Sequence, residues 1–81
     1  MTSVSEIIDL LTEISEDPSA TKNLKAKITQ VVSILKADSD LSLKINKASH
    51  ELDEIASSQE IDSYTRTQLL GVVSALENVD E

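Results

Sequence analysis

The chain has 81 residues, including no cysteine, one glycine, one proline and a single aromatic residue, Tyr64. This composition excludes disulfides and thiolate metal sites, and it predicts a core of leucine, isoleucine and valine. The formal net charge of −8 argues against general binding to nucleic acids or anionic membranes, whose phosphates would repel it. No apolar run approaches the length of a membrane span, so we expect a cytoplasmic protein.

Apolar residues recur at every third or fourth position in four stretches, as they do on one face of an α-helix. A single glycine and a single proline argue against a turn-dense β fold. The stretches predict helices over residues 4–16, 21–37, 41–57 and 63–79. We therefore expect one all-α domain over residues 1–81, an up-down-up-down four-helix bundle of two hairpins, about 4–37 and about 41–79.

Capping and turn residues place the ends of these helices. Ser3 with Glu6 three residues later is a capping-box pattern at the start of the first helix. Pro18 disfavours helical geometry at the residue before it, so the first helix should end there. Either Asp62 or Ser63 is expected to cap the fourth helix.

The two halves of the chain resemble each other at a spacing of 41 residues. When residues 10–36 are aligned with 51–77, seven of 27 pairs are identical, against about two expected by chance. The identical pairs are Leu11/Leu52, Glu13/Glu54, Ile14/Ile55, Val31/Val72, Val32/Val73, Ser33/Ser74 and Leu35/Leu76. We infer that each half is a helical hairpin and that the halves pack about a pseudo-twofold axis.

Three blocks of the second half resemble a known family, and they are Leu52-Asp53-Glu54-Ile55, Tyr64-Thr65-Arg66-Thr67-Gln68 and Val73-Ser74-Ala75-Leu76-Glu77. Their order and spacing are similar to those of uncharacterised protein family 0147, a group of short archaeal proteins with a helical-bundle fold. Asp17-Pro18 resembles part of the family's first half, whereas Thr21 and Asp62 stand where its members usually have proline. The resemblance implies the same fold and an archaeal origin, but no activity, because the family has none established.

Candidate catalytic and metal-binding groups are few. His50, the only histidine, shares a helix with Asp53 and Glu54, but bundle di-metal centres need Glu-x-x-His pairs on facing helices. The inward positions are aliphatic, and nothing predicts the desolvated pocket that shifts the pKa of a catalytic carboxylate. We therefore expect no metal site, no cofactor and no enzyme activity. An enzyme would be possible only if a partner or a cofactor supplied the chemistry.

The best candidate binding site lies at the start of the fourth helix and consists of Tyr64, Thr65, Arg66 and Thr67. An arginine beside a tyrosine and two hydroxyls suits an anion or a carboxylate of a partner. The alternative is a structural role, in which Arg66 pairs with Glu54, and Lys25 with Glu13, each across its own hairpin. We favour the structural ion pair.

A second candidate surface consists of apolar residues outside the main stripes, namely Val32, Ile34, Leu70 and Val73. These residues either widen the core-facing stripe or form an interface. Small size, without disulfides or metal, favours self-association as a symmetric dimer through them.

These features favour a non-catalytic protein–protein interaction or scaffold module with an unidentified protein partner. A second interpretation is an accessory subunit of a nucleoprotein assembly that uses the lysine-rich helix from Lys22 to Lys36. An exposed row of these lysines without carboxylate neighbours would support the second interpretation.

Overall fold

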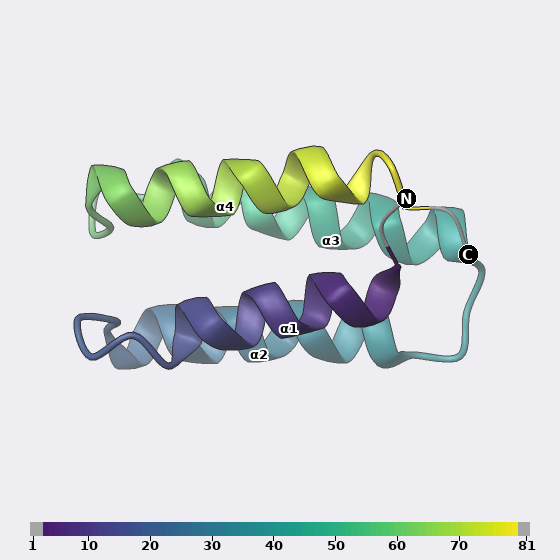
Figure 1. The fold of residues 1–81 in the computed structure, drawn as a ribbon, viewed down its shortest axis with the longest axis horizontal. Coiled ribbons are helices and arrows are strands. Elements are labelled where there is room, and N and C mark those ends of the chain that lie inside the picture. Colours follow the sequence, from purple (N-terminus) through teal and green to yellow (C-terminus); the bar gives the residue numbers. More distant parts are fainter. Residues whose placement is uncertain (1–2, 80–81) are drawn as a thin grey trace.

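The computed structural model describes residues 3–79, which form four α-helices. Their bounds are α1 Val4–Ser15, α2 Lys22–Lys36, α3 Leu41–Ala56 and α4 Ser63–Leu76. Figure 1 shows the α1–α2 hairpin packed on the α3–α4 hairpin, with each helix antiparallel to the one before it. Every helix contacts two neighbours, so the four form a closed ring. The predicted all-α four-helix bundle is confirmed, while the predicted outer limits, residues 1 and 81, lie outside the described range.

The core is aliphatic, and both hairpins contribute to it. The buried apolar side chains are Val4, Ile7, Leu11, Ile14, Leu24, Ile28, Val31, Leu35, Ala48, Leu52, Ile55, Ala56, Leu69, Val72 and Leu76. The eight buried positions of the first hairpin recur 41 residues later as seven buried residues, including Thr65, and the half-buried Ile45. Corresponding positions of the two hairpins therefore face the same core. Among the described residues, no helix is long and apolar enough to cross a membrane.

Side-chain caps begin α1 and α4 at the places that the sequence predicts. The hydroxyl of Ser3 accepts a hydrogen bond from the backbone N–H of Glu6 at 3.2 Å, which confirms the cap of α1. Asp62 caps α4 and accepts a hydrogen bond from the N–H of Thr65 at 2.8 Å. A carboxylate at this position also interacts favourably with the positive end of the helix dipole.

The helix α4 ends earlier than predicted, at Leu76 instead of residue 79. The side-chain amide of Asn78 donates to the carbonyl of Ser74 at 3.1 Å. The N–H groups of Asn78 and Val79 bond to carbonyls three residues back, at 3.0 and 3.3 Å. Bonds that span three residues instead of four tighten the last turn, and the helix ends there.

Arg66, at the fourth position of α4, fastens this helix to the end of α3. Its Nε donates to the carbonyl of Ala56 at 2.9 Å, and its Nη2 donates to the carbonyl of Ser58 at 3.2 Å. Carbonyls at a helix C-terminus lack helical partners and carry partial negative charge, so they attract a cation. The predicted Glu54–Arg66 ion pair is therefore wrong for the described part of the chain. Glu54 instead lies 3.2 Å from Nε2 of His50, one helical turn away.

Lys44, at the fourth position of α3, makes the same kind of contact with α2. Its Nζ donates to the carbonyls of Leu35 and Ala37, at 3.2 and 3.1 Å. Both cations thus bind two carbonyls that lie two residues apart at the end of the preceding helix. This contact fixes the turn between consecutive helices by charge and hydrogen bonding together.

Lys25, at the corresponding position of α2, is exposed and makes no such hydrogen bond within residues 3–79. The carbonyl of Asp17, which corresponds to Ser58, accepts the N–H of Ala20 at 2.9 Å. The turn after α1 therefore satisfies this carbonyl with its own backbone. The predicted Glu13–Lys25 ion pair is also wrong within the same residues.

Replacing Arg66 with methionine, which keeps an apolar stem but removes the donors, should lower the free energy of unfolding by about 1–3 kcal/mol. The matched control is Lys25→Met, which removes an exposed cation at the corresponding position and should change stability by no more than about 0.5 kcal/mol. Urea denaturation followed by circular dichroism measures both values. Equal losses in the two variants would contradict the structural role of Arg66.

Candidate interaction groove

An open groove lies between α1 and α4, the neighbouring helices that pack together least extensively. It has a volume of about 280 Å³ and is lined by Leu10, Glu13, Ile14, Gln68, Gly71 and Val72. Leu10 remains 42% exposed, although leucine is among the residue types most often buried. The groove therefore presents aliphatic surface to water beside two polar side chains.

Gly71 keeps this groove open. It lies inside α4 and is exposed, and a Cβ added there would meet no atom within 4 Å. Glycine inside a helix costs up to about 1 kcal/mol relative to alanine. Neither a positive φ nor a close approach of another chain segment requires glycine here. A side chain at this position would lie in the groove, so its absence leaves room for a side chain of another molecule.

The corresponding groove between α2 and α3 is lined mostly by polar residues. It has a volume of about 330 Å³ and is lined by Thr29, Gln30, Ser33, Ile34 and Glu51. At the spacing of 41 residues, Gln30 corresponds to Gly71 and Glu51 corresponds to Leu10. The two hairpins share one core but differ at these two edges, because only one edge pairs leucine with glycine. The mismatch between these residue pairs is visible in the sequence, but neither of the two predicted binding surfaces includes Leu10 or Gly71.

Carboxylates flank the α1–α4 groove on the side of α1. Glu13 lines it, and Glu6 and Asp9 continue an exposed acidic row along the same helix. In the described part of the chain, none of the three lies within 4.0 Å of a lysine or arginine nitrogen. Helix α1 contains no basic residue, and the one base of α4, Arg66, donates to carbonyls at the end of α3. The groove is therefore bordered by uncompensated negative charge.

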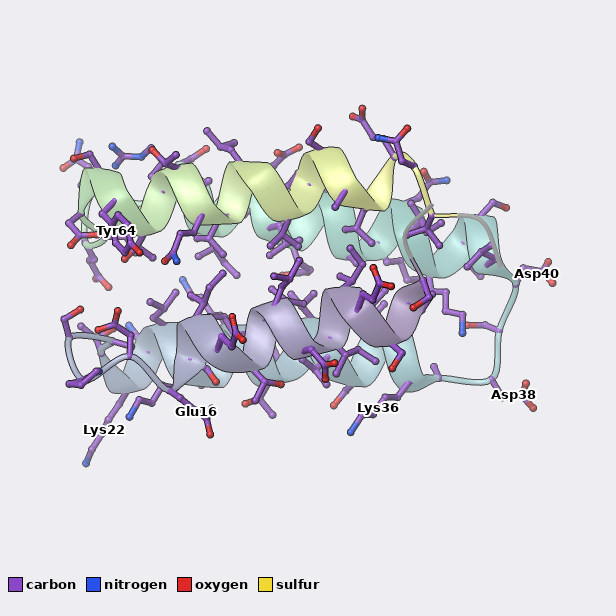
Figure 2. The ribbon with its side chains drawn as sticks, in the orientation of Figure 1. Glu16, Lys22, Lys36, Asp38, Asp40 and Tyr64 are labelled. Carbon is purple, nitrogen blue, oxygen red and sulfur yellow. The ribbon has the colours of Figure 1, made fainter. Side chains whose placement is uncertain are left out.

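The residues of the predicted binding block at the start of α4 do not form one surface. Arg66 donates a hydrogen bond to the carbonyl of Ala56 at the end of α3, and Thr65 is buried. Thr67 uses its hydroxyl to donate to the carbonyl of Ser63 at 2.9 Å. Figure 2 shows Tyr64 on the side of α4 that faces the α1–α2 hairpin. The Tyr64 hydroxyl accepts a 3.4 Å hydrogen bond from the side chain of Gln68, which lines the groove, while Tyr64 itself does not line it.

The residues predicted for self-association lie in two different environments. Val32, Ile34 and Val73 are half-buried and pack against the core, as the alternative of a wide core-facing stripe requires. Leu70 is 50% exposed on α4. Leu70 is therefore the most exposed residue of this set. The symmetric dimer stays a prediction.

His50 lies on the exposed surface of α3, beside Glu54. Across residues 3–79, no three potential metal ligands come together. His50 and Glu54 therefore form a solvent-exposed pair within one helix.

Two carboxylates lie in the turns at one end of the bundle. Asp17 accepts hydrogen bonds from the hydroxyl and the N–H of Ser19, at 2.7 and 2.8 Å, and these bonds hold the pKa of Asp17 below its ordinary value of 3.8. Hydrogen bonds from Thr65 likewise lower the pKa of Asp62. A pocket of about 120 Å³ lies between the two turns and is lined by Ser19, Thr21, Leu24, Glu60, Ile61, Asp62 and Thr65. No basic side chain lines it, so it does not suit an anion.

The lowered pKa of Asp62 predicts a defined loss of stability in acid. The capped carboxylate stabilises the native state above its unfolded pKa, and this contribution is lost as the pH falls through the lower native pKa. Asp62→Asn, which retains a capping side chain, should remove this contribution to acid unfolding. It should also lower the pKa of Asp17 further, because the nearby charge of Asp62 raises that pKa. Acid unfolding followed by circular dichroism compares the two proteins, and NMR titration of the carboxyl carbons gives the pKa of Asp62 in wild type and the change at Asp17 in the variant. A midpoint for Asp62 at or above 3.8 in wild type would contradict the cap.

Comparison with known proteins agrees with the resemblance seen in the sequence blocks. The model described as "Uncharacterised protein family (UPF0147)" matches residues 1–79, a span that includes all four helices and both sides of the groove. No curated protein and no solved structure gives a significant match. The chain therefore belongs to the uncharacterised protein family UPF0147.

Proposed function

We propose that this protein is a non-catalytic interaction module that binds a partner protein through the α1–α4 groove. The observation that carries the proposal is an exposed helical glycine, Gly71, which lines the groove with the half-exposed Leu10 and where an added Cβ would meet no atom within 4 Å. An aliphatic side chain of a partner placed there would remove Leu10 from water. Filling an open apolar site in this way is the usual source of binding energy at interface hot spots.

The chemistry of the groove suits binding better than catalysis. Its polar side chains are Glu13 and Gln68, and Glu13 is exposed. No nucleophile stands beside a base in the groove, and its lining contains no histidine, lysine or arginine. Glu13 and Gln68 can orient a partner by hydrogen bonding while the aliphatic surface supplies the affinity.

Filling the groove tests this proposal without unfolding the protein. Gly71→Leu places a side chain in the groove, and it should raise stability by up to about 1 kcal/mol because glycine is a poor helix former. The matched control, Gln30→Leu, places the same side chain at the corresponding position of the α2–α3 edge. Wild type and both variants serve as baits in extract of the cells that make the protein, with quantitative mass spectrometry of the retained proteins.

We expect at least one protein that wild type and Gln30→Leu retain equally and that Gly71→Leu retains about tenfold less. Thermal denaturation confirms that Gly71→Leu is folded. If all three baits retained the same proteins in the same amounts, the groove would not be the binding site.

A second candidate function is that of an accessory subunit in a nucleoprotein assembly. It is supported by the lysines of α2, which are Lys22, Lys25, Lys27 and Lys36. All four are exposed, and none lies within 4.0 Å of a carboxylate in the described part of the chain. Figure 2 shows Lys22 and Lys36 projecting from α2 away from the other hairpin. Nuclease-sensitive complexes that Gly71→Leu leaves intact would favour this candidate.

A further inference from the structure

We propose that the partner segment is an amphipathic helix whose aliphatic residues are flanked by lysine or arginine. This inference rests on the proposed function, because it names the class of partner that the α1–α4 groove binds. It follows from the shape of the groove and from the charge that borders it.

The shape favours a helical segment. The groove runs along two antiparallel helices, from Leu10 to Ile14 on one side and from Gln68 to Val72 on the other, about one helical turn on each. The helices of residues 3–79 offer no open sheet edge, so an extended peptide could not satisfy its backbone by adding a strand. A proline-rich segment needs an aromatic-lined groove, and the lining here contains no aromatic residue. A helix satisfies its own backbone and presents side chains at spacings of three and four residues, which match the length of this groove.

The charge favours a basic segment. Glu6 and Glu13 lie four residues before and three residues after Leu10, so both neighbour it on the surface of α1. Asp9 lies between them in the same exposed row. These carboxylates have no lysine or arginine partner in the described part of the chain, as shown above. Lysine or arginine side chains that flank the aliphatic residues of a partner would therefore meet free carboxylates on both sides of Leu10.

A second copy of this chain fits the groove less well. Its own leucine at the same edge is flanked by the same carboxylates, so a symmetric contact would bring Glu6, Asp9 and Glu13 close to their counterparts. The formal net charge of −8 on each copy adds to this repulsion. The structure therefore favours a partner of opposite charge.

Selection from a display library of 16-residue helical peptides tests the class of partner. The library varies the residues at the apolar face and at its borders, and it is selected on wild type and counter-selected on Gly71→Leu. We expect the peptides that depend on Gly71 to combine aliphatic residues at helical spacing with a net positive charge. Neutral or acidic peptides that depend on Gly71 would overturn the basic partner and leave the groove function standing. If the selection gave no peptide whose binding depends on Gly71, both the basic partner and the binding function of the groove would be overturned.

A charge-matched pair of variants separates local attraction from the effect of overall charge. The test variant neutralises the acidic row through Glu6→Gln, Asp9→Asn and Glu13→Gln. The control variant removes the same charge elsewhere through Asp38→Asn, Asp53→Asn and Glu54→Gln. Fluorescence anisotropy with the most enriched basic peptide at low salt should show about tenfold weaker binding to the test variant, and about twofold weaker binding or less to the control. Equal weakening in the two variants would overturn the role of the acidic row.

Discussion

Burial of aliphatic side chains at every third or fourth position is the interaction on which the rest of this bundle depends. The chain has no cysteine, phenylalanine or tryptophan, so neither cross-links nor large rings stabilise it. Among the described residues, Thr65 is the one polar residue in the buried set, and no buried side-chain nitrogen or oxygen lacks a partner. Each fully buried leucine or isoleucine contributes about 1.5–3 kcal/mol. Because packing supports the fold, the charged and polar residues outside the core can serve turns and surfaces.

The turns show how these polar residues are used. Arg66 and Lys44 each bind one carbonyl in the last turn of the preceding helix and one just beyond it, and so hold consecutive helices together at the turn between them. Thr21 and Asp62 stand where the resemblance implies proline, and here each accepts a hydrogen bond from an N–H in the first turn of its helix, at 3.1 and 2.8 Å. Proline fixes the start of a helix through its backbone angle, whereas these caps fix it by satisfying a free donor.

The periodicity predicts the four helices and an aliphatic core, because the spacing of apolar residues determines which face of a helix turns inward. The contacts of Arg66 could not be predicted in the same way. The sequence places Arg66 near both Glu54 and the end of α3. It does not show which carbonyls there lack a backbone N–H as a hydrogen-bond partner. The carbonyl of Ser58 is free, while the carbonyl of Asp17 is not, and that difference depends on how each turn closes.

The groove was harder to predict than the core because its two sides lie far apart in the chain. Leu10 and Gly71 meet only when α1 packs against α4 and completes the ring of helices. Each residue alone looks ordinary, as one exposed leucine and one exposed glycine. At the spacing of 41, Leu10 corresponds to Glu51 and Gly71 corresponds to Gln30. Both differences between the hairpins therefore fall on the α1–α4 edge, and together they identify the groove.

On this account, the α1–α4 edge of the bundle binds an apolar side chain in preference to the corresponding α2–α3 edge. NMR of the methyl-labelled protein, titrated with isopropanol as a small aliphatic probe, tests this claim most directly. We predict that the largest shift changes occur at the methyl groups of Leu10, Ile14 and Val72, and that Gly71→Leu abolishes them. Shift changes as large at Ile34, in the α2–α3 groove, or changes that Gly71→Leu leaves intact, would contradict the account.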